Sequence, residues 1–192
     1  AVLAVGEYFK RTDDKGPWGL TPGSTGGTQY ECRQNYNILM TDGYWTKGDI
    51  SGLDNSDNLS GSAITNDSSP AIPATYTYIP SLPYSDAYSD TLADAVMQYW
   101  KNDLRTDLPN KVPTNPHDPA FWQHVVTFTV GLGVTGTLTE LPSGAQSWPD
   151  PEKNEAAKID DLWHAAVNSR GEFFSAADPT AFANALTSAL KT

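Results

Sequence analysis

Segments with the pattern of β-strands alternate along this chain with segments of helical periodicity. Ile38 to Met40 form a short apolar run without polar alternation, which is typical of a strand buried on both faces of a sheet. The stretch "HVVTFTVGLGV", at 124–134, is β-branched and ends in glycines, as in a central strand. The stretch "EFFSA", at 172–176, predicts a third, shorter strand. Strands that alternate with helices predict an α/β fold with a mainly parallel sheet and helices on both faces.

Two helices are predicted in the first half of the chain. The first runs from Ala1 to about Arg11, before the turn formers of "TDDKGPWGLTPGSTGG" break its periodicity. The second should begin near residues 89–91, because Thr91 and Asp94 have the spacing of a capping box. The apolar positions of these helices are Val2, Leu3, Val5, Phe9, Leu92, Ala95, Val96, Tyr99, Trp100 and Leu104.

Two further helices are predicted in the second half. Asp150 is a suitable cap with Pro151 in the first turn, and Gly171 could end that helix in a left-handed conformation. The last helix repeats the start pattern with Asp178 followed by a proline. The inner face of the helix that follows Asp150 is formed by Ile159, Leu162, Trp163 and Ala166.

A polar segment from about residue 44 to 90 separates the first strand from the second helix. It is far longer than the usual connection of about 4 to 6 residues, so we interpret it as an inserted surface excursion. Its "TYTYI" could form a small strand, and the rest should be turns and coil. The aromatic residues of this insertion could bind glycans or proteins, but we favour a role in anchoring it to its own domain. They are Trp45, Tyr76, Tyr78, Tyr84 and Tyr88.

The insertion is also rich in acidic and amide side chains. Its first part contains Asp49, Asp54, Asn55, Asp57 and Asn58. Their spacing lacks the alternating acids, central glycine and terminal glutamate of an EF-hand loop, so we favour a solvated loop over a calcium site. Asp86 and Asp90 are expected to serve turns and the entry to the second helix.

Composition narrows the classes of partner. The formal net charge of −11 would repel a nucleic acid backbone or an anionic lipid surface at long range. No apolar run approaches the roughly 20 residues of a membrane-spanning helix, and the opening "AVLAV" lacks the basic leader of a signal peptide. We therefore expect no nucleic acid partner and no membrane span. The many Pro, Gly, Ser, Thr and Asn residues in long connections are typical of a secreted protein.

Three strands make a thin sheet for an α/β domain. If one edge of such a sheet and its helices stayed open, about five large apolar side chains would be exposed, at about 1.5 to 3 kcal/mol each. That loss is comparable to the net stability of a whole domain, about 5 to 15 kcal/mol. We infer that the chain is part of a larger domain, or that something else supplies the missing strands.

Cys32 is the single cysteine of the chain. In an oxidising compartment an unpaired thiol indicates a disulfide partner outside these residues or a reactive group. A small buried side chain is the alternative interpretation.

Two enzyme hypotheses find little support. Gly131, Gly133 and Gly136 match a Gly-x-Gly-x-x-Gly pattern, but the following "TLTELPSG" does not favour the helix that a dinucleotide site needs. The three histidines, His117, His124 and His164, have no metal-ligand spacing, and a local hydrogen bond is expected for each. No serine or cysteine stands in the context of a nucleophile elbow.

Several phrases resemble the second half of a von Willebrand factor A domain, a three-layer Rossmann-like fold. More narrowly, nearly the whole chain resembles the PilC/PilY family of type IV pilus tip proteins. The similar phrases are "RQNYNILMTDGYW", "TLADAVMQYWKNDLRTDL", "DPAFWQHVVTFTVGLGV" and "DDLWHAAVNSRGEFFSA". On this resemblance, residues 1–192 are the C-terminal portion of an A-type domain with an insertion at about 44–90.

The resemblance implies a secreted adhesin and pilus assembly factor at the pilus tip or outer membrane. Its expected partners are minor pilins and a host or surface receptor. The missing first half of the A domain and a C-terminal β-propeller are expected outside this chain. The family works by binding, so no enzyme activity is expected. A purely structural pilus or filament subunit is the alternative.

The resemblance also implies a metal-ion-dependent adhesion site. Only Asp42 matches the family pattern here, because no Asp-x-Ser-x-Ser motif is present in these residues. A divalent cation is implied, with Mg²⁺ preferred and Mn²⁺ or Ca²⁺ as alternatives. Asp42 could instead cap the following turn. Cys32 could lock the insertion or the missing half through a disulfide. The neighbouring candidates for ligand binding are Thr41, Gly43, Tyr44 and Trp45.

Overall fold

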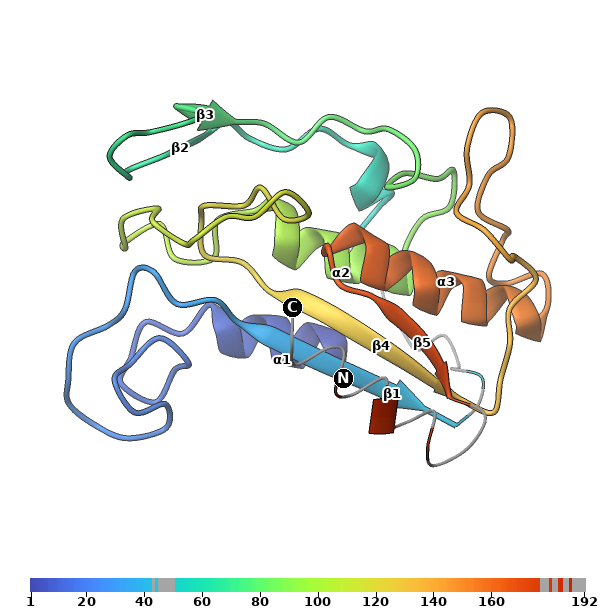
Figure 1. Ribbon diagram of the computed structural model, residues 1–192, viewed down its shortest axis with the longest axis horizontal. Coiled ribbons are helices and arrows are strands. Elements are labelled where there is room, and N and C mark those ends of the chain that lie inside the picture. Colours follow the sequence, from blue (N-terminus) through green and yellow to red (C-terminus); the bar gives the residue numbers. More distant parts are fainter. Residues whose placement is uncertain (43, 45–50, 177–179, 181–182, 185–186, 188–192) are drawn as a thin grey trace.

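The computed structural model describes residues 1–42, 44, 51–176, 180, 183–184 and 187 (Figure 1). The helices are α1 (Val2–Phe9), α2 (Leu92–Lys101) and α3 (Glu155–Asn168), with a short 3₁₀ turn, η1 (Ser56–Asn58). The strands are β1 (Tyr36–Thr41), β2 (Ile64–Thr65), β3 (Thr75–Tyr76), β4 (Val126–Leu132) and β5 (Phe173–Ala176). This order confirms the predicted alternation of helices and strands.

The main sheet has the strand order β1-β4-β5, and both pairs are parallel. Thr41 pairs with Gly131, and Gly131 pairs with Ser175. The three strands therefore end at the same edge of the sheet, as Figure 1 shows from their arrowheads. An α/β fold with a parallel sheet, compatible with a Rossmann-like arrangement, is thus confirmed.

The position of β1 differs from the expectation. Within the described residues β1 pairs with β4 alone, and β4 is the central strand, as its sequence predicted. Tyr36 is 47% exposed and Met40 51% exposed, although the middle of a doubly covered sheet was expected here. A run of apolar residues predicts that a strand is buried. It does not predict which elements cover the edges and faces of that strand.

The three described helices pack on one face of the sheet. Asn37 of β1 and Thr127 of β4 line a small cavity with Val2 and Val5 of α1 and with Val96 of α2. On the same face, the hydroxyl of Thr129 donates to the carbonyl of Leu162 in α3, at 2.9 Å. The opposite face carries an apolar cluster of Ile38, Val126, Phe128 and Phe174.

A second helical layer over that opposite face stays a prediction. The helix expected from Asp178 lies mostly outside the described residues. Val126 and Phe128 of that face are buried, at 6% and 2% exposure, whereas Ile38 and Phe174 are partly buried and Met40 is 51% exposed.

The start of α2 confirms the predicted capping box. The hydroxyl of Thr91 accepts from the amide of Asp94 at 3.1 Å, and the carboxylate of Asp94 accepts from the amide of Thr91 at 3.0 Å. Asp161 of α3 adds a second cap, because its carboxylate accepts from the amides of Leu92 and Ala93. Together these bonds satisfy amides that the first turn of a helix leaves without partners.

Both ends of α3 differ from the prediction. The N-cap is Asn154, whose side chain accepts from the amide of Ala157 at 2.9 Å, whereas Asp150 closes a separate turn. At the other end Arg170, with φ of 64°, adopts the left-handed conformation expected of Gly171. A glycine is required at 171 for another reason, since a Cβ there would collide with the carbonyl of Thr127.

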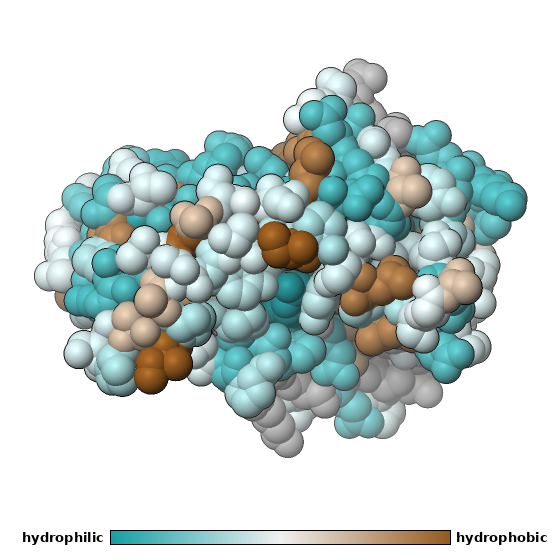
Figure 2. Space-filling model, turned by 90° about the horizontal axis from the view of Figure 1, so that it is seen from above, coloured by the Kyte–Doolittle hydropathy of each residue, from teal (hydrophilic) through white to brown (hydrophobic). Residues whose placement is uncertain are grey.

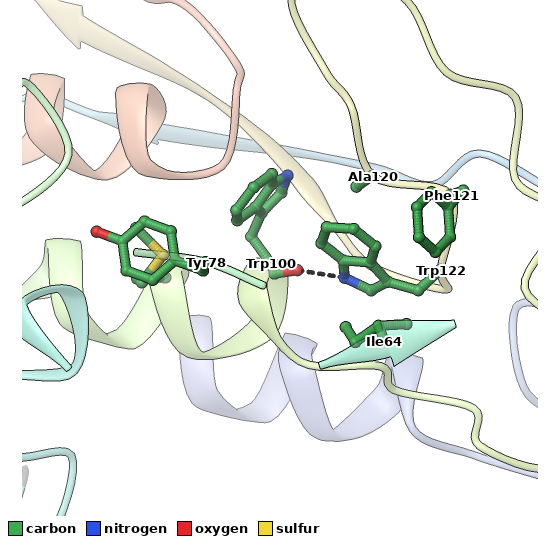
Figure 3. Close-up of a cluster of buried hydrophobic side chains, with 7 residues drawn as sticks. Ile64, Tyr78, Trp100, Ala120, Phe121 and Trp122 are labelled. Atoms are coloured by element: carbon green, nitrogen blue, oxygen red, sulfur yellow. Dashed lines mark hydrogen bonds between the residues drawn. The ribbon is translucent and has the colours of Figure 1, made fainter. Parts of the chain in front are cut away.

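The insertion is part of the core. Its β2 and β3 strands pair antiparallel and lie in an outer layer, beyond the C-terminal end of α2 (Figure 1). Figure 3 shows Ile64 and Tyr78 of the insertion beside Trp100 of α2 and Trp122, whose indole nitrogen donates to the Trp100 carbonyl at 2.7 Å. The guanidinium of Arg170 lies 3.7 Å from the ring centroids of both Trp100 and Tyr84. Anchoring by aromatics is therefore confirmed for Tyr76, Tyr78 and Tyr84, while Trp45 lies outside the described residues.

The outer face of the insertion is mostly hydrophilic. Figure 2 shows apolar side chains there as separate small patches. Among the described residues, no helix has the length and apolar character needed to cross a bilayer.

Trp100→Ala should lower the free energy of unfolding by about 3 to 5 kcal/mol, because it removes the ring that joins α2 to the insertion and to Arg170. Urea denaturation followed by circular dichroism measures the change. Ile72→Ala is the matched control, since Ile72 lies in the same insertion but is 77% exposed, and should change stability by less than about 0.5 kcal/mol. Equal effects of the two substitutions would contradict the anchoring role of Trp100.

Candidate functional site

The C-terminal edge of the sheet carries the residues that the sequence singled out. Thr41 is half-buried and Asp42 is exposed, at the edge where β4 and β5 also end. Tyr44 is 50% exposed, whereas Gly43 and Trp45 lie outside the described residues. Within the part of the chain that the structure describes, Asp42 belongs to no group of three or more potential metal ligands. Its role as a metal ligand stays a prediction that depends on further residues.

A different group of potential metal ligands lies beneath the insertion. Asp57 Oδ2 is 3.5 Å from His164 Nε2, and Asp86 Oδ2 is 3.4 Å from His164 Nδ1. One ligand atom from each residue lies within 4.8 Å of the other two. The side chains of Asp57, Asp86 and His164 are only 0%, 3% and 1% exposed. This buried group, from η1, the end of the insertion and α3, could hold a metal ion.

Neighbouring groups hold these side chains in place. The carboxylate of Asp57 accepts from the amide of Asp86 at 3.1 Å and from the side-chain amide of Asn168 at 3.0 Å. The ring of His164 stacks on Trp148 with centroids 4.3 Å apart and an angle of 15°. The orientation of the group is therefore determined by packing as well as by charge.

Two expectations are wrong at this position. The ring nitrogens of His164 have no hydrogen-bond partner, so this histidine is not satisfied by a local bond. Asp57 is fully buried and does not belong to a solvated loop. Both errors have one physical cause, namely that the polar insertion folds back over α3 and excludes water from it.

A signal for this site was present in the sequence of α3. Asp161, His164 and Asn168 have i, i+3, i+7 spacing and form a polar stripe, opposite the apolar face that the sequence analysis identified. Such a stripe is usually solvated. Here Asn168 is fully buried and Asp161 nearly so, because the stripe faces α2 and the insertion.

Burial disfavours the ionised form of the carboxyl groups around the site. It raises the pKa of Asp57 and of Asp161 to about 7, and His164 partly offsets the rise for both. It also raises the pKa of Asp94. Asp94 and Asp161 accept hydrogen bonds from backbone amides at the N-terminus of α2, where the helix dipole favours negative charge. Among the described residues, no lysine or arginine forms an ion pair with Asp57 or Asp86.

The other two histidines have ordinary environments. His117 is exposed and its amide closes a turn on Asn115. His124 is buried, with Nδ1 2.7 Å from the carbonyl of Trp122 and Nε2 2.8 Å from Asp118 Oδ2. Both ring nitrogens of His124 therefore have a hydrogen-bond partner. The expected local hydrogen bond is confirmed for His124.

The structure tests the predictions made for Cys32 and for the Gly-x-Gly-x-x-Gly pattern. Cys32 is a free, exposed thiol, so its interpretation as a small buried side chain is wrong. Gly131 lies within β4, which ends at Leu132, and the described residues from 133 to 154 contain no helix. The carboxylate of Asp160 lies against Gly136 and caps the amides of Thr137 and Leu138. The absence of a dinucleotide-type helix start is therefore confirmed.

Comparisons with known proteins identify relatives of this chain. The chain is 39% identical to the type IV pilus biogenesis factor PilY1 of Pseudomonas aeruginosa strain PAK over 93% of its residues. It is 34% identical to PilY1 of strain UCBPP-PA14 over 83% of its residues. The chain spans 17% and 16% of the lengths of these relatives. No protein-family model matches the chain, and no solved structure is significantly similar to it.

The parallel sheet, its helices and the polar residues at its C-terminal edge define an α/β segment compatible with a Rossmann-like fold. Within that class the similarity is specific, since it extends over most of the chain in each of three relatives with the same name. The chain belongs to the PilC/PilY family.

Asp118→Asn should destabilise the protein at pH 7 by about 1 to 3 kcal/mol. Burial alone would raise the pKa of Asp118, but hydrogen bonds from His124, the Ala120 amide and the Trp100 indole lower it below the ordinary value. A lowered folded pKa means that Asp118 contributes stability above its unfolded pKa of about 4, and that this contribution is lost as the pH falls through the folded pKa.

The two curves of unfolding free energy against pH, for the wild type and Asp118→Asn, should therefore converge below about pH 4. Asp54→Asn is the control, because Asp54 is exposed, and its curve should follow the wild type throughout. A constant difference between wild type and Asp118→Asn would contradict the role given to the Asp118 charge.

Proposed function

We propose that this chain is part of a surface-displayed type IV pilus biogenesis factor and adhesin, which works by binding and not by catalysis. The names and the similarity of the three relatives support this role. Its location would be the pilus tip or the outer membrane, and its partners minor pilins and a host or surface receptor. A C-terminal β-propeller would follow in the complete protein.

The free edge of β1 supports the proposal that the rest of an A-type domain docks there. In the described residues β1 has a partner strand on one side only. Tyr36 and Met40, both about half exposed, lie along it. An open edge with apolar side chains favours pairing with another strand. The missing first half of the domain would supply that strand, with the insertion at 44–90 forming one wall of the domain.

The observation that carries the binding proposal is the common end of the three strands. A parallel α/β sheet binds ligands at the carboxyl ends of its strands, and Asp42 follows β1 at that edge. Asp42 would contribute one oxygen to Mg²⁺, or to Mn²⁺ or Ca²⁺, and residues outside this chain would complete the site. A ligand carboxylate could then replace a bound water. Thr41, Gly43, Tyr44 and Trp45 would border the ligand.

A structural pilus or filament subunit is the second candidate. The same free edge of β1 could serve as a contact between subunits, and the exposed Cys32 could join them by a disulfide. In that case the carboxylate of Asp42 would only cap the turn after β1.

Asp42→Ala in the complete protein should weaken Mg²⁺ or Mn²⁺ binding at least about tenfold, because it removes a direct or water-mediated ligand. Isothermal titration calorimetry measures the affinity. Bacteria with this substitution should assemble pili in normal number but adhere poorly. Glu140→Ala is the matched control, since Glu140 is an exposed acid in the segment after β4. Unchanged metal affinity would remove Asp42 from the site, and unchanged adhesion would favour the structural candidate.

Hydrogen exchange can test whether a strand docks on β1. In the complete protein, amides of residues 36–41 that do not face β4 should exchange at least about tenfold more slowly than in the isolated chain. Amides of β4, which has partners on both sides, are the internal control. Equal exchange of the β1 amides in the two proteins would argue against a docked strand.

A further inference from the structure

The unpartnered histidine beneath the insertion is the least explained polar group of the molecule. His164 is fully buried, and neither of its ring nitrogens makes a hydrogen bond. Asn168, one helical turn away, has a buried side-chain oxygen that also has no partner. Native proteins rarely leave such groups unsatisfied, because each costs about 1 to 3 kcal/mol. A missing partner, such as an ion, is a common reason.

The spacing of the carboxylates fits an ion. Ligand atoms about 2.0 to 2.2 Å from a tetrahedral zinc ion are roughly 3.4 Å apart. One ligand atom from each of Asp57, Asp86 and His164 lies within 4.8 Å of the other two. Asp57 Oδ2 is 3.5 Å from His164 Nε2, and Asp86 Oδ2 is 3.4 Å from the other ring nitrogen, Nδ1. These contacts are longer than strong charge-assisted hydrogen bonds, which measure about 2.7 to 2.9 Å.

We propose that Asp57, Asp86 and His164 bind one Zn²⁺ ion, which links both ends of the insertion to α3. One ring nitrogen coordinates the ion. The other nitrogen carries the proton, because a histidine binds a metal as the neutral imidazole. The side-chain amide of Asn168, which donates to Asp57, orients that carboxylate.

Charge balance favours a divalent ion over a protonated histidine. With both carboxylates ionised, as ligands of a metal ion are, Asp57 and Asp86 carry two negative charges, which an imidazolium would neutralise only by half. The ammonium of Lys101 donates to the carbonyls of Ser56 and Leu59 and forms no ion pair with either carboxylate, although its charge acts on Asp57 at longer range. A Zn²⁺ ion balances both carboxylates. Buried charges that are not balanced in this way are strongly destabilising.

The donor set selects the kind of ion. Mg²⁺ and Ca²⁺ prefer oxygen ligands only, whereas imidazole together with carboxylates suits Zn²⁺. The site is also separate from the proposed site at Asp42, which lies at the sheet edge and is exposed. Because the ligands are at most 3% exposed, the ion would enter as the insertion closes over α3 and would exchange slowly.

Metal analysis of the full-length protein tests the proposal. The protein is purified without a histidine tag from medium that contains Zn²⁺, and its zinc content is measured by mass spectrometry. Wild type and the control Asp54→Asn should contain one equivalent of zinc more than Asp86→Asn and His164→Gln. Asp54→Asn removes one acid from the same insertion outside the group. Asp42→Ala should keep this equivalent, which separates the site from the adhesion proposal.

X-ray absorption spectroscopy at the zinc edge identifies the ligands of zinc in the wild type. This measurement does not depend on whether the variants fold. The spectrum should show an imidazole nitrogen and oxygen ligands, without sulfur. Prolonged incubation with a chelator should lower the melting temperature of the wild type and of Asp54→Asn but not that of Asp86→Asn. A wild type without zinc, equal zinc in all variants, or a spectrum without imidazole would overturn the proposal.

Discussion

The fold depends on the burial of α2 between the sheet and the insertion. One side of α2 packs through Val96 and Tyr99 against α1 and the strands, while Met97 and Trp100 pack against the insertion. This two-sided burial removes more apolar surface from water than a thin three-stranded sheet could alone. A segment with the composition of a loop thereby becomes a stabilising part of the core.

Because the insertion covers the helices, it also buries several carboxylates that would otherwise be solvated. The polar stripe of α3 and the acids of the insertion are brought together where water is excluded. Asp161 meets the amides at the start of α2, which compensate its charge. Asp57 and Asp86 accept hydrogen bonds from neutral amides but lie at the N-terminus of no α-helix, and His164 has no hydrogen-bond partner. For this reason the strongest candidate for a second metal site lies there. The exposed Asp42 has no comparable cost, because water solvates it.

Much of the architecture could be predicted from local patterns. Capping residues and apolar periodicity were sufficient for α1, α2 and the three parallel strands, and the parallel order followed from their alternation with helices. Errors arose where local patterns compete. Asp150 and Asn154 are both suitable N-cap residues. Asp150 closes a separate turn, and Asn154 therefore caps α3. Arg170 adopts the left-handed conformation in place of Gly171, and its side chain stacks between Tyr84 and Trp100.

By itself the sequence determined where α1, α2, α3 and the three parallel strands lie, and that Asp42 follows a strand at the carboxyl edge of a parallel sheet. It did so because hydrophobic periodicity and caps act over a few residues. Only the tertiary structure decided that β1 lies at an edge of the described sheet, and that Asp57, Asp86 and His164 meet. Such contacts between residues distant in the chain depend on how whole elements pack. A local sequence pattern does not predict which polar face of a helix another segment will cover.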